Sequence, residues 1–298
     1  MKNESGKRNL ALCLGLVSII YAVAGQAVHA HTPVGFRLVS DALVVVPVLI
    51  NEEGPFDFLL DTGTSTTIIT PGLARQLNLQ ASGNVSLITL AGTEVVPQTV
   101  LDSLALGAKS IKRLEVLFDD LRGVRAVDAK IRGVLGQNFL SRFNYLLSYR
   151  ERCIEFEEDG DLESRLTGTR LAVEQREGKL IVSSQATTPW QETLRLALDS
   201  GASHLVLFAA ARNRLGFRME PPGTGFLAAT NAAGNHVKLR RLQSLQIGSE
   251  RLANLPVALI EDHAPLERYE DGLLPTRLFR AIFFQNDKHQ VILNPHAA

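Results

Sequence analysis

Cysteine is scarce in this chain, and its charges balance. Only Cys13 and Cys153 occur among the 298 residues, and neither lies in a Cys-x-x-Cys pair or in a Cys/His cluster with the spacing of metal ligands. We therefore expect no zinc site, no disulfide framework and no cofactor. Lys and Arg together number 31, as do Asp and Glu, so no net charge attracts nucleic acid or an anionic membrane. The hydrophobic share of 45% predicts a globular core.

The apolar run near the N-terminus is too short to span a bilayer comfortably. A basic head precedes this run, which covers residues 10–24, and the small-residue sequence Val28-His29-Ala30 follows it. This order predicts a signal peptide over residues 1–30 and a periplasmic or secreted protein without stable membrane insertion. An uncleaved membrane anchor is the alternative. Once the signal is removed, Cys153 is the only thiol, so no internal disulfide can form.

A short motif occurs twice, half a chain apart. Leu59-Leu60-Asp61-Thr62-Gly63-Thr64-Ser65 is followed 138 positions later by Ala197-Leu198-Asp199-Ser200-Gly201-Ala202-Ser203. An apolar segment that begins with glycine follows each aspartate, after 72 and 73 residues: Gly133-Val134-Leu135-Gly136 and Gly272-Leu273-Leu274-Pro275. A single Asp-Thr-Gly is also typical of an ordinary turn after a strand. Two copies with matched spacing indicate a duplicated unit instead.

The local patterns around each copy repeat as well. Each copy has β-rich residues before the aspartate, a short strand, a short helix and a hairpin after it. The β-rich residues are 42–50 in the first copy and 171–183 in the second, and the short strands are 67–69 and 205–208. The short helices are 71–77 and 209–215, and the hairpins are 85–96 and 226–239. The acidic segment 155–163 is the best candidate for a linker. The sequence thus predicts an all-β protein with lobes at 31–158 and 166–298.

These motifs resemble those of the aspartic peptidases of the retropepsin and pepsin type, over nearly all of the chain after residue 30. The resemblance implies an acid-protease fold, with two similar pseudo-symmetric β lobes and a cleft between them. Most retropepsins resemble half of this chain and dimerise, whereas this chain contains both halves. It looks like a fused, bacterial-type retropepsin, so a monomer is expected.

The repeated residue types suit one chemistry. Two carboxylates about 3 Å apart cannot both ionise, so such a pair shares a proton, and one member activates water while the other protonates the substrate carbonyl. Asp61 and Asp199 are the candidates. Gly63 and Gly201 let the backbone pass beside the carboxylates and donate N–H groups to them. The resemblance implies that the hydroxyls of Thr62 and Ser200 bind the opposite loop and lock the lobes together.

Two differences between the copies bear on this chemistry. Thr64 can donate a hydrogen bond to Asp61, but the matching Ala202 cannot, which predicts that Asp61 holds the negative charge and Asp199 the shared proton. Pro275 stands where the first copy has Gly136, so the backbone there is in question.

Candidate substrate-binding residues flank the motifs. Ser65, Ser203 and His204 follow the two aspartates, and the resemblance implies that the His204 position lies beside the substrate. A solvated or internally satisfied histidine is the simpler alternative. The two hairpins would act as flaps, with Ala91-Gly92 and Ala233-Gly234 at their tips and no tyrosine of the pepsin kind.

These residues predict an aspartic endopeptidase that cleaves an extended polypeptide. The alternative is a catalytically silent peptide-binding module with the same fold.

Overall fold

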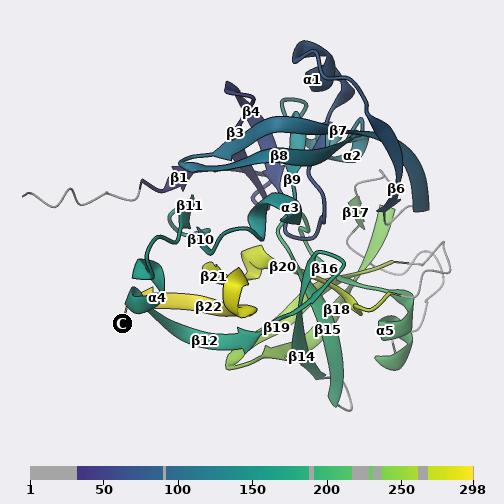
Figure 1. Cartoon of the computed structure of the whole chain (residues 1–298). Helices are drawn as coiled ribbons and strands as arrows, with labels where there is room; N and C mark the ends of the chain where they lie inside the picture. Colours follow the sequence, from purple (N-terminus) through teal and green to yellow (C-terminus); the bar gives the residue numbers. More distant parts are fainter. Residues whose placement is uncertain are drawn as a thin grey trace, which may run out of the picture. The chain divides into compact units, whose positions relative to one another are not determined.

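The computed structural model describes residues 32–89, 92–187, 191–216, 228–230, 236–260 and 268–297. Strands dominate these residues, and the helices are short (Figure 1). The predicted all-β class is confirmed. Residues 1–30, where we predict the signal peptide, lie outside the described residues. Within the described part of the chain, no helix is long and apolar enough to cross a membrane.

The first lobe is built on an eight-stranded sheet. In spatial order its strands are β2 (Arg37–Val39), β3 (Leu43–Ile50), β4 (Glu53–Leu60), β9 (Gly133–Leu135), β5 (Ile68–Ile69), β8 (Lys109–Phe118), β7 (Gly92–Leu106) and β6 (Gly83–Thr89). The pairs β4–β9 and β5–β8 are parallel, and the other neighbours are antiparallel. Strand β3 also pairs with β7, so the sheet folds back on itself.

The second lobe repeats this arrangement. Its strands, in the same spatial order, are β13 (Glu174–Arg176), β14 (Lys179–Thr187), β15 (Gln191–Asp199), β20 (Gly272–Pro275), β16 (Leu205–Leu207), β19 (Glu250–Leu259), β18 (His236–Ile247) and β17 (Ala228–Thr230). The pairs β15–β20 and β16–β19 are parallel, as the matching pairs of the first lobe are. Strand β14 also pairs with β18. The duplication seen in the sequence is thus a duplication of topology.

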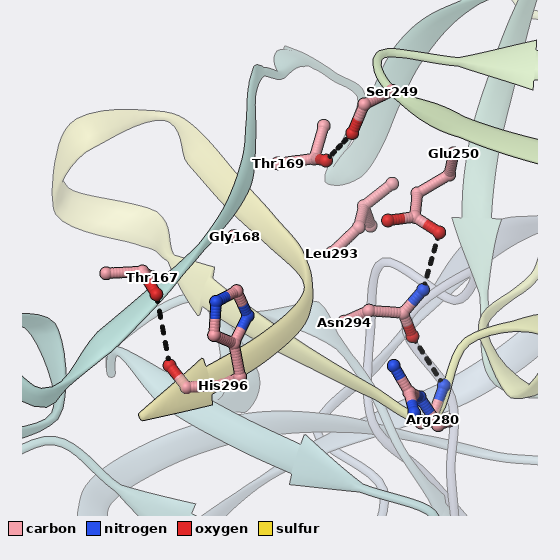
Figure 2. A pocket seen from close by; sticks show the side chains of 9 residues that line it. All are labelled: Thr167, Gly168, Thr169, Ser249, Glu250, Arg280, Leu293, Asn294 and His296. Atoms are coloured by element: carbon pink, nitrogen blue, oxygen red, sulfur yellow. Dashed lines mark hydrogen bonds between the residues drawn. The ribbon is translucent and has the colours of Figure 1, made fainter. Parts of the chain in front are cut away.

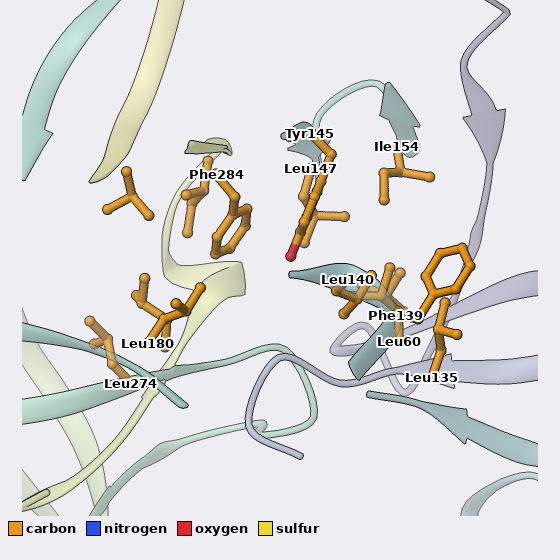
Figure 3. Packing of buried hydrophobic residues seen from close by; sticks show 14 of the residues in the cluster. Leu60, Leu135, Phe139, Leu140, Tyr145, Leu147, Ile154, Leu180, Leu274 and Phe284 are labelled. Atoms are coloured by element: carbon orange, nitrogen blue, oxygen red, sulfur yellow. The ribbon is translucent and has the colours of Figure 1, made fainter. Parts of the chain in front are cut away.

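A third sheet contains strands from both halves of the chain. Its order is β1 (Val34–Gly35), β11 (Cys153–Phe156), β10 (Tyr145–Ser148), β21 (Ala281–Gln285), β22 (Gln290–Ala297) and β12 (Leu166–Ala172). At its centre β10 pairs with β21, with Tyr145 opposite Phe284. Their rings stack with centroids 4.7 Å apart inside the core (Figure 3). Shared strands and a shared core therefore join the halves.

The helical elements are α1 (Pro71–Gln76), α2 (Arg122–Val127), α3 (Gln137–Leu140), α4 (Asp161–Arg165), α5 (Ala209–Arg214) and the 3₁₀ turns η1 (Thr276–Leu278) and η2 (Asn286–Lys288). The short helices predicted over 71–77 and 209–215 are α1 and α5. Helix α1 begins where expected because the Thr70 side chain accepts a hydrogen bond from the Leu73 N–H and Pro71 occupies the first turn.

The prediction of a linker over residues 155–163 is wrong in part. Residues 155 and 156 belong to strand β11, and α4 begins at Asp161, so only residues 157–160 lie outside regular structure. The Glu157 carboxylate accepts hydrogen bonds from the N–H groups of Leu162 and Glu163. These bonds satisfy the start of α4, which explains why an acidic, glycine-containing segment forms ordered structure here.

Candidate active site

The two aspartates occupy matching places in the two lobes. Asp61 directly follows β4, and Asp199 is the last residue of β15. Each of these strands lies parallel to the short glycine-initiated strand of its lobe, β9 or β20. The Asp61 N–H donates to the Leu135 carbonyl at 3.0 Å, and Asp199 pairs in register with Pro275. The downstream repeats thus support the backbone beside each aspartate.

Residues 61–65 and 199–203, here called the first and second Asp loops, face each other. A Cβ placed on Gly63 would lie 2.6 Å from the Asp199 Cγ, and one placed on Gly201 would lie 2.8 Å from the Asp61 Cγ. Only glycine permits this approach. The Gly63 N–H donates to Asp61 Oδ1 at 2.8 Å, and the Gly201 N–H donates to Asp199 Oδ1 at 2.7 Å. Each carboxylate is therefore held by its own loop and packed against the other.

Buried hydroxyl groups connect the two loops. Thr62 Oγ1 donates to the Leu198 carbonyl at 2.8 Å, and Ser200 Oγ donates to the Leu60 carbonyl at 2.7 Å. Each hydroxyl also accepts a backbone N–H from the opposite loop, at 3.0 Å in both cases. Thr62 and Ser200 are almost fully buried. These four bonds hold the two Asp loops together and so keep the aspartates close to each other.

The surroundings of the two carboxyl groups differ. Thr64 Oγ1 donates to Asp61 Oδ2 at 2.7 Å, whereas Ala202 offers no hydroxyl to Asp199. Asp199 is buried, with 7% of its surface exposed. Burial raises the pKa of Asp199 well above its ordinary value, and the neighbouring charge of Asp61 raises it further. The N–H groups of Gly201 and Ala202 act in the opposite direction on this pKa but do not outweigh burial.

Three supporting residues were not predicted from the sequence. Gln137 Nε2 donates to the Thr62 carbonyl at 3.0 Å, and the Tyr149 hydroxyl lies 2.6 Å from Thr276 Oγ1. Burial raises the pKa of the Tyr149 phenol, and the charge of Asp199 adds to this shift, so Tyr149 lies near the second aspartate. Gln137 and Thr276 directly follow the two glycine-initiated segments, a position that could have singled them out. Nothing in the sequence marks Tyr149.

The candidate substrate-binding residues lie at the outer ends of the Asp loops. Ser65 and Ser203 are exposed, and Ser203 Oγ lies 2.9 Å from His204 Nδ1. Burial lowers the pKa of His204, and the positive charge of Arg277 lowers it further. Arg277, which lies two residues after the glycine-initiated segment of the second lobe, was not predicted.

The predicted hairpins are present. Strands β6 and β7 pair with Val85 opposite Val96, and β17 pairs with β18 with Thr230 opposite His236. Gly92 is the first residue of β7. The other proposed tip residues, Ala91, Ala233 and Gly234, lie outside the described residues.

Pro275 fits the backbone that the second lobe adopts. Its φ is −61°, within the range that proline requires, and it forms the last residue of β20 before η1. Gly136, its counterpart, is the residue before α3, and a Cβ there would lie 2.7 Å from the Thr66 carbonyl carbon. The ψ angle is 122° at Pro275 and −175° at Gly136, so the two lobes turn differently after this strand.

A polar hollow of about 720 Å³ lies away from the aspartates, and β12, β22 and the turn between β18 and β19 line it (Figure 2). Its side chains bind one another. Asn294 Nδ2 donates to Glu250 Oε2 at 2.7 Å, and the backbone N–H of Arg280 donates to Asn294 Oδ1 at 2.8 Å. None of the predicted site residues lines it. Among the described residues, no cluster of three His, Cys, Asp or Glu side chains could hold a metal ion.

The fold and the facing Asp loops define a class of protein, the two-lobed acid proteases. The chain belongs to the aspartyl protease family, whose model matches it twice, over residues 46–139 and 188–277. One of these matches lies in each lobe of the chain.

One solved structure with partial similarity is that of a retropepsin-like aspartic protease from Rickettsia conorii. The two are 20% identical with a TM-score of 0.33, and the match covers 42% of this chain and 89% of that chain. No curated protein matches this chain.

Proposed function

We propose that the protein is an active aspartic endopeptidase with Asp61 and Asp199 as its catalytic residues. The observation that supports this best is the packing of each aspartate against the glycine of the opposite loop. Two carboxyl groups in such proximity share one proton. The difference between their surroundings supports a division of labour, with the charge on Asp61 and the proton on Asp199.

In the first half of the proposed reaction, the charged Asp61 accepts a proton from a water molecule as the water oxygen attacks the peptide carbonyl carbon. Asp199 donates its proton to the carbonyl oxygen, so a neutral tetrahedral intermediate forms. In the second half, the carbon–nitrogen bond breaks and the leaving amine takes the proton from Asp61. One hydroxyl of the intermediate returns its proton to Asp199, which restores the original state of the pair.

Single substitutions test this proposal. Asp61→Asn and Asp199→Asn should each abolish cleavage of a denatured protein over the whole pH range, because the pair acts as one unit. Asp102→Asn is the matched control, since Asp102 is exposed on strand β7. Near wild-type turnover in either active-site variant would disprove the two-aspartate mechanism. If the wild-type protein bound peptides but cleaved none, the silent peptide-binding module would replace this proposal.

We further propose that the protein acts as a monomer outside the cytoplasm. Both aspartates lie on one chain, so no partner is needed to complete the pair, and specific activity should stay constant on dilution. Activity that falls on dilution together with a dimer-to-monomer shift in light scattering would contradict this. The basic and apolar pattern of residues 1–30 supports export. N-terminal sequencing of the protein recovered from cells would show whether cleavage occurs after Ala30.

A further inference from the structure

Arg277 lies at the edge of the second Asp loop, in the turn η1 that follows β20. Its Nη1 donates to the Asp41 carbonyl of the first lobe at 2.8 Å, and its Nε donates to the Ser203 carbonyl at 3.4 Å. Both acceptors are neutral backbone groups. Within the described residues, no carboxylate lies within ion-pair distance of Arg277, although its side chain is exposed. Its positive charge therefore remains uncompensated by these residues.

The charge of Arg277 acts on two side chains beside the second Asp loop, His204 and Tyr149. It lowers the pKa of His204, and it opposes the rise in the pKa of Tyr149 that burial and Asp199 produce. Ser203, which binds Arg277, lies only four residues beyond Asp199 on the same loop. An extended peptide advances about 3.3 Å per residue. A peptide whose scissile bond lies at the aspartates would thus reach Arg277 within a few residues.

The first lobe has no such charge at the matching position. Asn138 occupies the place of Arg277 two residues after Gly136, and its side chain bonds within its own lobe. Asn138 Oδ1 accepts from the Thr67 N–H at 2.9 Å, and Nδ2 donates to the Glu115 carbonyl at 2.7 Å. The corner formed by Ser203, His204 and Arg277, here called the Arg277 corner, therefore contains a positive side chain, whereas the matching residue of the first lobe, Asn138, is uncharged.

We propose that the Arg277 corner is a specificity determinant that binds an acidic side chain of the substrate. This inference rests on the proposed function, because it assumes that a peptide lies across the aspartates. A guanidinium has five N–H donors, of which two bind the backbone here, and it suits carboxylate geometry. Because only one lobe has the charge, the preference falls on one side of the scissile bond.

The test is a set of paired peptides. Starting from one cleaved peptide, Gln and Glu versions are made at each of four positions on either side of the bond. The ratio of kcat/KM for Glu over Gln is then measured by mass spectrometry. The wild-type ratio should reach about 10-fold at one or two adjacent positions, because a charge-assisted hydrogen bond is lost with Gln. At the positions across the scissile bond it should remain close to one.

Variants assign this preference to the residue. Arg277→Gln should bring the ratio to about one, and Arg277→Lys should retain part of it because the charge remains. Arg75→Gln, at an exposed arginine on α1, should leave it unchanged. A ratio is insensitive to the amount of folded protein, so loss of the bond to Asp41 does not mimic this result. An Arg277→Gln profile equal to that of the wild type, or a wild type without a Glu preference, would overturn the inference.

A binding measurement separates this inference from the proposed function. Fluorescence polarisation with the same labelled peptides and the Asp61→Asn variant should give the same Glu preference in Kd, and Arg277→Gln in that background should remove it. If the wild-type protein cleaves no peptide but this preference in Kd is present, the endopeptidase proposal fails and the specificity assignment stands. If the protein cleaves peptides but shows no Glu preference, the endopeptidase proposal stands and the specificity assignment fails.

Discussion

Thr62 and Ser200 bind each other's backbone in reciprocal fashion. The Thr62 hydroxyl accepts the N–H of Ser200 and the Ser200 hydroxyl accepts the N–H of Thr62, each at 3.0 Å, across 138 positions of sequence. Both side chains are buried, so water cannot replace these bonds. The pair couples the stability of the lobe interface to the position of the two aspartates.

Removal of one of these hydroxyls should be costly. Ser200→Ala leaves the Thr62 N–H and the Leu60 carbonyl without their partner, and a buried unsatisfied group costs about 1–3 kcal/mol. We expect the free energy of unfolding to fall by about 2–4 kcal/mol in urea titrations. Ser200→Thr, which keeps the hydroxyl and copies the first lobe, should cost far less. Equal losses in the two variants would show that the hydroxyl is not the cause.

The raised pKa of Asp199 should appear in the pH dependence of stability. An unfolded Asp titrates near 3.9, so the native state binds an additional proton above that pH. The stability that Asp199 contributes is present below about pH 4 and is lost as the pH rises through its native pKa. Asp199→Asn has no proton to lose, so its stability relative to the wild type should increase through this window by about 1.4 kcal/mol per pH unit.

Urea unfolding of Asp199→Asn and the wild type between pH 3 and 8 measures this difference. The exposed Asp102→Asn variant controls for the loss of one carboxylate elsewhere. A gap between Asp199→Asn and the wild type that stayed constant with pH would mean that burial does not shift the Asp199 pKa in the native protein.

The Thr64 hydroxyl should shape the pH–rate profile of the proposed endopeptidase. It donates to the Asp61 carboxylate, and such a hydrogen bond stabilises the charged form of the pair. Thr64→Ala removes this donor, so the lower apparent pKa of the pair should rise by roughly one unit and move the acid limb upward. Thr64→Ser should leave the acid limb in place.

Conversely, Ala202→Thr should lower the upper apparent pKa and move the alkaline limb down. If neither limb moved in Thr64→Ala and Ala202→Thr, the hydroxyl would have no electrostatic role.

A side chain at Gly178 should be destabilising, because this residue touches the opposite lobe. It lies in the turn between β13 and β14, and a Cβ there would lie 2.8 Å from the Ser65 Cβ. Gly160 has nearly the same φ, +77° against +78°, but nothing within 4 Å of its Cβ position. Alanine is strained in the left-handed backbone conformation of both positions. Only Gly178→Ala also introduces a clash, which should lower the free energy of unfolding further, by about 1–3 kcal/mol.

Thermal or urea unfolding of Gly178→Ala and Gly160→Ala compares the two sites directly. Adding Ser65→Gly to Gly178→Ala removes the clashing atom and should recover most of the additional loss. No recovery in this double variant would assign the loss to the backbone alone.

Much of the fold could be predicted from local pattern. The duplicated Asp motif and its matched spacing predict two similar lobes, and the short strands and helices after each aspartate lie within a residue or two of their predicted limits. These features follow from turn chemistry and side-chain periodicity, which act between near neighbours. The linker over 155–163 was mispredicted because acidic residues also satisfy the start of a helix.

The third sheet could not be predicted in the same way. Its central pair, β10 with β21, joins residues that are more than a hundred positions apart. No turn connects the two strands, because each pairs along the chain with its own partner, β11 or β22. Their pairing depends on the packing of rings such as Tyr145 and Phe284, which only the folded chain brings together.

The sequence by itself determined the residue types of the site: two aspartates, their glycines and the hydroxyls beside them, in two copies. Only the tertiary structure decided how unequal the copies are. The desolvation that raises the pKa of Asp199 depends on which groups surround this side chain, and so does the charge of Arg277, which pairs with no carboxylate of the described residues. Electrostatic interactions act through space rather than along the chain, so they follow from the final packing of both lobes.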